Sequence, residues 1–525
     1  MRKNLLLAAT VMALFSVSAS ADVRYVKAGA SGDGSSWANA SGSIDAMIAA
    51  SQAGDEVWIA EGTYKPVELI RSNKKNSRAF TLKDGVSLYG GFAGTENSKA
   101  DRAVGAKDYE FIHETILSGD DDVADQWVRE YQAGSDYLYG FRTEDDIIPG
   151  TANNSNHILY SASALANETV IDGFTLKGGN AMVWNVKAAG GALYATGNVK
   201  MNGCKVVENS AYFTAQSTTD SDTKGGAVYL IGSDDAAITN CYFARNYSHS
   251  SYGNGLGGAV YASNVRIAGC EFEECVSLDN GGALICFGGT VEDCTFRNCY
   301  AALGGAVYNR GVMTGCKVYD CKGLNGGGIF NLGTVKNTIV ANCKADTELY
   351  GSDQGGAGGG VYLYDGELDN VAVFNCMAFN GGGVFVKGGE VKNATIQNNA
   401  SRNAAAAANI VCDGEAVSNS IVADDVENSN FEHPTSFQGI AVTEAQKEEI
   451  LLASWNLTAS SALAGKGYNA GGGTTAIAPV AESAVVAAEY FSLDGKAVAN
   501  PRGGVYVQKV KLSDGTIRTK KVMFK

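Results

Sequence analysis

The chain has 525 residues, 45% of them hydrophobic, with 66 glycines against 5 prolines and a formal net charge of −15. This composition is too apolar and too poor in proline for a disordered chain, and the length exceeds that of one ordinary domain. The negative charge argues against nucleic acid and anionic membrane surfaces as partners, and leaves neutral glycans, cations and proteins.

Residues 1–21 have the features of a secretory signal peptide. Arg2 and Lys3 precede the apolar run LLLAATVMALFSV, which is followed by the small residues Ala19-Ser20-Ala21 of a cleavage site. We therefore expect cleavage before Asp22 and an exported protein. No other stretch of the sequence reaches the roughly 18 apolar residues of a membrane helix.

Residues 22–180 precede the regular repeats and are predicted to form an N-terminal cap and the first coils of the fold. Residues 119–150 are inserted there and are rich in acidic and aromatic side chains. Five aspartates could offer oxygen ligands to Ca²⁺: Asp120, Asp121, Asp122, Asp145 and Asp146. Their spacing matches neither an EF-hand nor a nonapeptide repeat, so the favoured interpretation is a solvated lid with no metal or cofactor.

Residues 181–473 contain two alternating sequence units. Glycine pairs followed by a small, an aliphatic and usually an aromatic residue begin at Gly190, Gly225, Gly257, Gly281, Gly304, Gly326, Gly358 and Gly381. Between them lie short segments such as AITNCYFARN and VMTGCKVYDC, with no helical stripe. The connections between these segments are too short for the helical crossovers of an ordinary parallel sheet. They fit a coil of strands in which each round pairs with the next. The sequence therefore predicts an all-β fold, a parallel β-helix rising roughly 4.8 Å per coil.

Two positions of the second unit, five residues apart, are predicted to form columns inside the coil. The first column contains Cys204, Cys241, Cys270, Cys294 and Cys316, continued by Thr338, Val371, Ala394 and Ser420. The second contains Asn209, Asn246, Cys275, Cys299, Cys321, Cys343, Cys376, Asn399 and Asp425. Small, weakly polar groups suit an interior column, so stacked free thiols are the favoured interpretation. Disulfides are the alternative, because exported proteins meet oxidising conditions. Metal binding is not expected, since the spacing is wrong and no histidine accompanies the cysteines.

The glycine-pair unit is interpreted as a tight turn followed by a strand. Its aliphatic position is predicted to point inward and includes Leu193, Val228, Val260 and Leu284. The next position then faces outward, because side chains alternate along a strand. It forms a predicted aromatic strip: Tyr194, Tyr229, Tyr261, Tyr308, Phe330, Tyr362 and Phe385.

Three insertions, residues 210–224, 247–256 and 344–357, are predicted to leave the coil at one corner. Each follows the second column and precedes the next glycine pair. We expect the second and third to border a notch whose aromatic rim would bind an extended glycan or a protein loop: Tyr212, Phe213, Tyr247, His249, Tyr252 and Tyr350. Surface loops without a role are the alternative.

Several motifs carry a family resemblance that covers nearly all of the chain after residue 21. They are GGAVY at 225, 257 and 304, RYVKAGASGDGSSWANA at 24–40 and FTLKDGVSLYGGFAGTE at 80–96. They resemble Bacteroidetes β-helix proteins whose repeats are like those of chlamydial polymorphic outer-membrane proteins. The resemblance implies a right-handed, pectin-lyase-like solenoid. It does not specify an activity, because members include adhesins, surface proteins and relatives of polysaccharide lyases.

The C-terminal residues differ from the repeats in composition. Residues 474–488 are predicted to be an alanine-rich linker, and residues 489–525 a small antiparallel β domain. The segment YFSLDGKAVANPRGGVYVQK is similar to C-terminal sorting domains of the type IX secretion system, which implies export by that machinery and removal of the tail. A plain β appendage is the alternative.

The sequence shows no catalytic motif. The Gly-His-Gly and Arg-Ile-Lys tripeptides that the resemblance leads one to seek in a hydrolase do not occur. His113, His157, His249 and His433 have no carboxylate at useful spacing and are expected in surface or loop positions.

We predict a monomeric, secreted or outer-membrane-associated surface protein that acts as an adhesin or a glycan- or protein-binding rod without catalysis. A polysaccharide-degrading lyase or hydrolase, with a site dispersed over several coils, is one alternative. A structural spacer of the cell envelope is the other.

Overall fold

The computed structural model describes residues 21–125, 148, 150–182, 188–213, 222–233, 235–250, 253–345, 355–412, 417–418, 420–423, 485–491, 498, 504–512 and 517–524. The chain divides into two compact units, Met1–Ala470 and Gly471–Lys525. Within the described ranges, no helix is long and apolar enough to cross a membrane.

The N-terminal part of the first unit forms a cap and the first coils. The helix α1 (Ile44–Ala50) begins after Ser43, whose side chain accepts a hydrogen bond from the backbone N–H of Ala46. Short 3-10 turns lie at Trp37–Asn39, Lys99–Asp101 and Thr151–Asn153. The early strands are β1 (Val23–Val26), β2 (Glu56–Ala60), β3 (Gly62–Tyr64), β4 (Phe80–Thr81), β5 (Ser87–Phe92) and β6 (Thr115–Ser118). Their pairing is parallel from the first strand on, β1 with β2 and β2 with β5.

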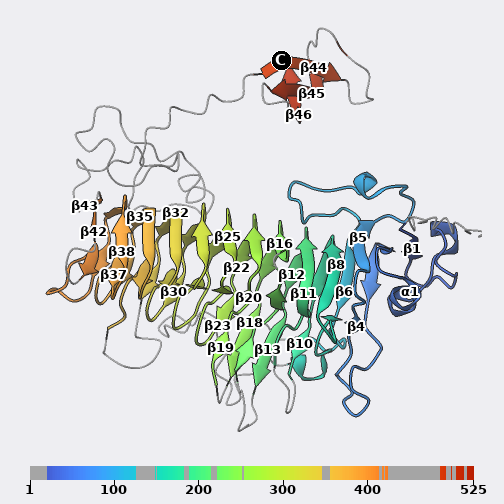
Figure 1. The fold of residues 1–525 in the computed structure, drawn as a ribbon, viewed down its shortest axis with the longest axis horizontal. Coiled ribbons are helices and arrows are strands. Elements are labelled where there is room, and N and C mark those ends of the chain that lie inside the picture. The colour runs from blue at the N-terminus through green and yellow to red at the C-terminus, as the bar shows by residue number, and fades with distance from the viewer. Residues whose placement is uncertain are drawn as a thin grey trace, which may run out of the picture. The chain divides into compact units, whose positions relative to one another are not determined.

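The remaining coils contribute strands to three ladders that run along the axis of the β-helix (Figure 1). The first ladder, which includes the strands that follow the glycine pairs, contains β7 (Leu159–Tyr160), β11 (Leu193–Asn202), β15 (Val228–Gly232), β20 (Val260–Ser263), β24 (Leu284–Phe287), β27 (Val307–Asn309), β31 (Ile329–Asn331), β34 (Val361–Leu363), β37 (Val384–Val386) and β41 (Ile410–Cys412). The second ladder contains β8 (Leu165–Asp172), β16 (Ala237–Thr239), β21 (Arg266–Ala268), β25 (Thr290–Glu292), β28 (Val312–Thr314), β38 (Glu390–Lys392) and β42 (Val417–Ser418).

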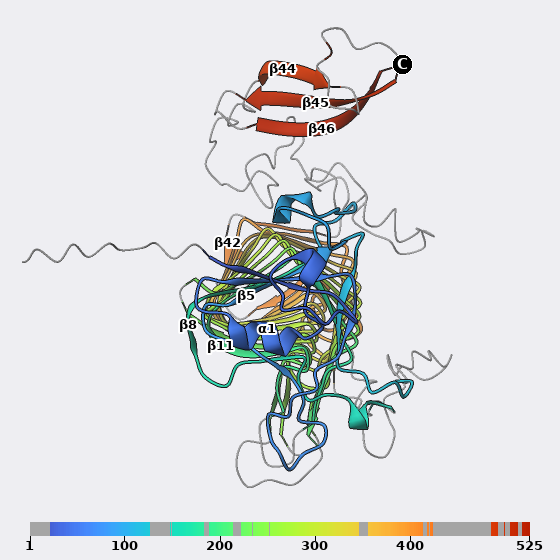
Figure 2. The same cartoon turned by 90° about the vertical axis from the view of Figure 1, so that its right-hand side faces the viewer.

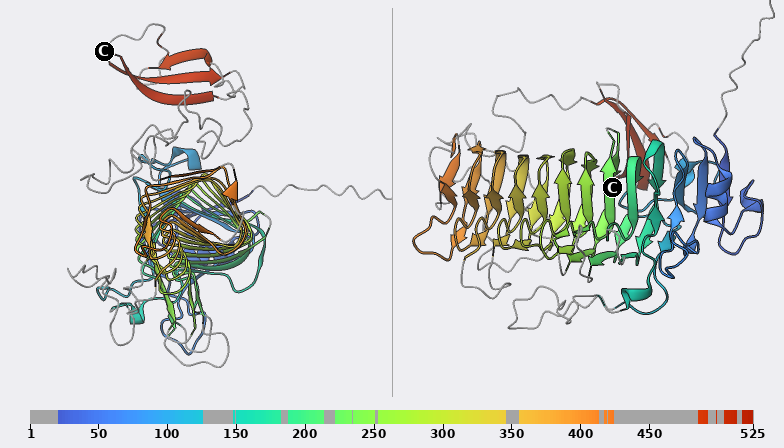
Figure 3. Two further views of the ribbon diagram at one scale, coloured as in Figure 1. Left: turned by 90° about the vertical axis from the view of Figure 1, so that its left-hand side faces the viewer. Right: turned by 60° about the horizontal axis from the view of Figure 1, so that its bottom comes forward.

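The third ladder contains β9 (Phe174–Lys177), β12 (Lys205–Val207), β17 (Tyr242–Ala244), β22 (Glu271–Glu273), β26 (Thr295–Arg297), β29 (Lys317–Tyr319), β39 (Thr395–Gln397) and β43 (Ile421–Ala423). The longer strands β32 (Thr334–Ala341) and β35 (Glu367–Phe374) run through the second and third ladders. Pairing from coil to coil is parallel and in register, as for Val228 with Val260 and Val260 with Leu284. Figure 2 shows these coils end on, and Figure 3 shows the strands side by side. The predicted parallel β-helix is confirmed.

Side chains of the first unit fill the coil in columns. The aliphatic positions Leu193, Val228, Val260 and Leu284 are fully buried, as expected. All twelve cysteines are free thiols, and eleven of them are buried. In both columns a thiol accepts a hydrogen bond from the coil before it, at 3.4 Å from Cys204 N to Cys241 Sγ and from Cys299 N to Cys321 Sγ. The structure therefore has the stacked-thiol arrangement and not disulfides.

The corners before these columns have left-handed backbone conformations. The residue before the first column is Gly203, Asn240, Gly269, Asp293, Gly315, Asn337, Asn370 or Asn393, each with φ between 48° and 67°. The residue before the second column is Glu208, Arg245, Glu274, Asn298, Asp320, Asn342, Asn375 or Asn398, again with positive φ. Glycine and asparagine reach this region at low cost, so their recurrence is explained by the sharp turn at each corner.

The glycine pairs are structural, as predicted. Gly304 has φ +69°, and a Cβ on Gly305 would lie 2.1 Å from the carbonyl oxygen of Gly327 in the next coil. Any side chain at the second glycine would therefore push neighbouring coils apart.

The second unit contains three antiparallel strands, β44 (Val485–Phe491), β45 (Gly504–Leu512) and β46 (Ile517–Phe524). The predicted small antiparallel domain is confirmed. Its first strand begins inside the segment expected to be a linker, residues 474–488, so that boundary moves towards the N-terminus.

Candidate functional site

A continuous aromatic strip lies on the outer side of the glycine-pair ladder. Tyr194, Tyr229 and Tyr261 occupy equivalent positions in successive strands. Their ring centroids are 4.9 Å and 5.5 Å apart, with nearly parallel planes. Further along, Tyr308, Phe330, Tyr362 and Phe385 stack at 5.2, 5.0 and 5.1 Å. The outward strip predicted from strand alternation is thus confirmed.

Two members of the strip were missed by the sequence analysis. Tyr160 of β7 extends it by one coil, 5.5 Å from Tyr194. In β24 the register position holds Ile285, and Phe287, two residues further on the same face, takes its place between Tyr261 and Tyr308. Two-residue alternation along β24 was the signal that could have found Phe287.

The most exposed ring beside the strip is that of Tyr364, whereas Phe330 within the strip is 7% exposed. Tyr364 follows β34, lies 5.8 Å from Phe330, and is 48% exposed. The guanidinium of Arg310 lies 5.5 Å from the centre of Phe287, over its ring. Elsewhere each ring covers the face of its neighbour, so mainly ring edges and tyrosine hydroxyls reach the surface. Burial raises the pKa of Tyr308 and Tyr362, so both hydroxyls remain protonated hydrogen-bond donors.

The notch predicted from the insertions is not formed as expected. Tyr212, Phe213, Tyr247 and His249 are 0, 4, 1 and 8% exposed, and therefore do not form a rim. Tyr252 and Tyr350 lie outside the described residues.

The reason is that the insertions continue as strands. They form a side sheet of β10 (Asn180–Ala181), β13 (Ser210–Phe213), β18 (Tyr247–Ser250) and β23 (Val276–Ser277), below the main coils in Figure 1. A two-stranded pair, β14 (Thr223–Lys224) and β19 (Gly255–Leu256), closes the same insertions. Further along lie β30 (Lys322–Gly323), β33 (Lys344–Ala345), β36 (Met377–Ala378) and β40 (Ala400–Ser401).

The aromatic side chains of the side sheet form a small core. Tyr247 packs with Ile148, Val276 and Tyr300. The hydroxyl of Tyr212 lies 3.2 Å from Thr151 Oγ1 and accepts a hydrogen bond from the side-chain amide of Asn180. These aromatic rings therefore stabilise the insertions instead of contacting a ligand.

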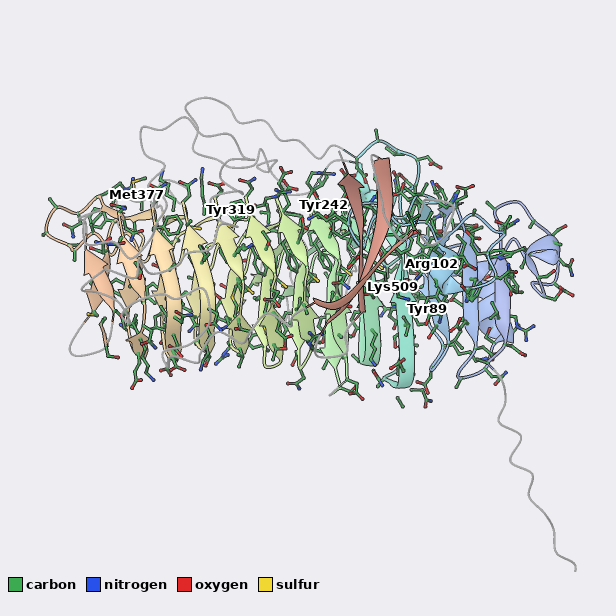
Figure 4. All side chains as sticks on the ribbon, turned by 90° about the horizontal axis from the view of Figure 1, so that it is seen from above. Tyr89, Arg102, Tyr242, Tyr319, Met377 and Lys509 are labelled. Carbon is green, nitrogen blue, oxygen red and sulfur yellow. The ribbon has the colours of Figure 1, made fainter. Side chains whose placement is uncertain are left out.

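A charged face lies outside the third ladder, where residues from distant coils meet. Tyr242 donates to Glu273 at 2.6 Å, and Arg297 donates to the same carboxylate at 3.0 Å. Lys107, from the loop that carries Arg102, pairs with Glu271 at 2.5 Å. Tyr242 lies along one edge of the coils in Figure 4, and Arg102 nearer the N-terminal end. Sequence spacing could not reveal this cluster, since Lys107 and Glu271 are 164 residues apart.

Two titratable groups of this face have shifted pKa values. Burial, followed by hydrogen bonding to Glu273, raises the pKa of Tyr242. Burial acts to raise the pKa of Glu208, but hydrogen bonds and charges from Lys177 and Arg245 hold it below its usual value. The face is therefore a network of ion pairs.

Three of the histidines differ from the expectation of partnerless surface positions. His249 is 8% exposed and lies in the strand β18. His113 Nδ1 lies 2.8 Å from Glu61 Oε2, so a carboxylate partner exists that the spacing concealed. His157 is 6% exposed, and its Nδ1 donates to the carbonyl of Gly190 at 2.8 Å. His433 lies outside the described residues.

The acidic insertion shows no metal centre in its described part. Asp122 pairs with Lys65 at 2.5 Å, and Asp125 accepts a hydrogen bond from Asn154 at 2.9 Å. No group of three or more His, Cys, Asp or Glu side chains in the described ranges is placed to hold a metal ion. Asp145 and Asp146 lie outside those ranges.

Comparison with family models bears on the fold of the central coils. A family model described as a right-handed beta helix region matches residues 206–345. The chain is also similar to the crystal structure of pectate lyase Pel9A, at 13% identity and a TM-score of 0.36, over 85% of this chain and 91% of that one. No curated protein matches the sequence. Together with the parallel coils, the family match makes this a right-handed parallel β-helix protein.

Proposed function

We propose that this protein is a secreted or cell-surface binding protein that contacts a glycan or protein ligand through the aromatic strip, without catalysis. The observation that carries the proposal is the uncharged run of stacked rings from Tyr308 to Phe385, with the exposed Tyr364 beside Phe330 and the guanidinium of Arg310 over the neighbouring Phe287. Tyrosine and arginine dominate the energetic centres of binding surfaces, because both combine an apolar surface with hydrogen-bond donors.

The geometry suits a ligand that lies along the coils. Ring centroids recur every 5.0 to 5.2 Å from Tyr308 to Phe385, so equivalent contacts repeat once per coil. An extended polymer with a short repeat would meet several of these contacts at once. The partly exposed ring of Tyr364 offers a face for stacking, while protonated hydroxyls such as that of Tyr308 donate to sugar or backbone oxygens.

Export is part of the same proposal. The signal-like residues 1–21 and the similarity of the C-terminal domain to type IX sorting domains support a location at the outer surface of the cell. A polysaccharide-degrading enzyme is the rival. The acid, base and cation of such an enzyme would have to come from the charged face. There, Glu273 already accepts hydrogen bonds from Tyr242 and Arg297.

The test combines a glycan array with a polysaccharide-cleavage screen on the chain from Asp22 onward. We expect binding without cleavage, weakened about three- to tenfold in Tyr364→Ala, as for the loss of one aromatic contact. The matched control is Tyr109→Ala, which removes one ring from a stacked pair with Tyr242 on the charged face, 5.3 Å between centroids. Cleavage of any polysaccharide that persists in Tyr364→Ala but is lost in Glu273→Gln would replace this proposal with the enzyme.

A further inference from the structure

A basic hairpin, residues 65–79, connects β3 to β4 and is the blue segment that projects beyond β4 in Figure 1. Leu69 and Arg78 form an antiparallel bridge, flanked by hydrogen bonds from Ile70 N to Ser77 O at 2.7 Å and from Ala79 N to Glu68 O at 3.2 Å. The hydroxyl of Ser77, 2% exposed, bonds to backbone atoms on both sides of the tip. The hairpin therefore has a defined shape.

The tip of the basic hairpin carries cations that no described residue neutralises. Arg71, Lys74 and Lys75 make no ion pair with any described residue, although the whole chain has a formal net charge of −15. The two cations at its base are engaged, since Lys65 pairs with Asp122 and Arg78 donates to the carbonyl of Asn153. A concentrated positive charge on an acidic protein favours an anionic partner at this place.

The outer leg of the basic hairpin is an open strand edge. Because Leu69 and Arg78 form a non-hydrogen-bonded pair, the backbone N–H and C=O of Leu69 point away from the other leg. Neither Val67 nor Leu69 makes a backbone hydrogen bond to any described residue. Their side chains are 70% and 44% exposed. Such an edge accepts a further strand.

We propose that the basic hairpin binds an extended acidic segment of a partner protein, which adds as a strand along residues 67–71. Backbone hydrogen bonds to Leu69 would align the segment. Its apolar side chains would cover Val67 and Leu69, and its carboxylates would pair with Arg71, Lys74 and Lys75. This surface is separate from the aromatic strip and does not depend on the proposed function.

The arrangement favours a peptide over an anionic membrane. The apolar side chains of Val67 and Leu69 lie between the body of the protein and the charged tip. At a bilayer, the cations of the tip would contact the lipid headgroups, and Val67 and Leu69 would not reach the hydrocarbon region. A peptide contacts both groups at once, because it lies along the leg.

The experiment measures fluorescence anisotropy of a short labelled peptide of alternating valine and glutamate, titrated with the mature chain. We expect saturable binding that falls roughly tenfold or more when Arg71, Lys74 and Lys75 are all replaced by glutamate. The single variants Lys75→Glu and Lys387→Glu form a matched pair, since both lysines are exposed and make no ion pair with described residues. Only Lys75→Glu should weaken binding.

Strand addition has its own test. Leu69→Pro removes an outward N–H without removing a hydrogen bond of the hairpin, so it should weaken peptide binding while the circular dichroism stays unchanged. Full peptide affinity in Leu69→Pro would overturn the strand-addition geometry. Equal affinity of the triple variant, or hairpin-dependent binding of anionic phospholipid vesicles with no binding of the peptide, would overturn the proposal.

Discussion

Protonation of His157 should make the stability of the β-helix fall in mild acid. The imidazole is buried against Tyr160, donates to the carbonyl of Gly190 and lies near the positive charge of Arg71. Burial, the largest cause, lowers its pKa from 6.5 to about 4. Between pH 6.5 and 4 the unfolded chain therefore binds a proton at His157 and the folded chain does not. The stabilising contribution of the neutral ring is fully present above pH 6.5 and is lost as the pH falls from there towards 4.

The size of the effect follows from the difference between the two pKa values. It reaches about 2 kcal/mol at pH 5 and about 3 kcal/mol below pH 4. His157→Asn keeps an amide donor in the position of Nδ1 and removes the titration. Between pH 8 and pH 5 the variant should therefore lose about 2 kcal/mol less stability than the wild type.

Urea unfolding followed by circular dichroism at both pH values measures the difference. Asp45 and Asp125, whose pKa values burial raises to about 6, act in the opposite direction but equally in both proteins. An identical pH dependence in wild type and variant, within about 0.5 kcal/mol, would refute the account of the buried neutral ring.

Three further predictions concern the coils. Gly305→Ala should destabilise the coils around it by about 3 kcal/mol, because its Cβ would meet backbone atoms of the next coil at 2.1 Å, whereas at Gly388 the nearest atom is 3.1 Å away. Hydrogen exchange of the neighbouring strands would show this, and equal exchange in the two alanine variants would contradict it. The eleven buried thiols should react with iodoacetamide only after the protein is unfolded, and they should need no prior reduction. Mass spectrometry of the labelled peptides measures both, and disulfide-linked peptides would contradict the stacked columns. Arg102→Leu should lower the free energy of unfolding by about 3 to 5 kcal/mol, because it leaves the buried carboxylate of Asp172 without its ion-pair partner. The two side chains are 2.5 Å apart and only 10 to 11% exposed. A loss below about 1 kcal/mol in urea unfolding would show that the pair is effectively solvated.

The periodic features of the fold were readable in the sequence. Glycine at Gly304 and Gly305, aliphatic residues such as Val307 and the cysteine columns recur because each coil places the same residue in the same environment. Because the coils stack in register, the same structural requirement recurs once per coil and selects a similar residue each time. The columns and the outward aromatic strip could therefore be predicted.

The insertions could not be read in the same way. Tyr212 and Tyr247 look like exposed aromatic residues of loops, yet they lie on neighbouring parallel strands and are 0% and 1% exposed. Nothing repeats often enough within two insertions to reveal a strand register. The distribution of charges was equally hidden, since the partners of Glu273 and His113 come from other coils.

The sequence by itself determined that this chain coils into parallel rounds, which residues face inward and which outward, and where the C-terminal domain differs from the repeats. Only the tertiary structure decided which outward side chains remain accessible and which ionisable groups neutralise one another. The physical reason is that repetition along the chain reports the local environment within a coil. Exposure and ion pairing depend instead on segments such as the loop of Lys107, which folds back over coils 164 residues away.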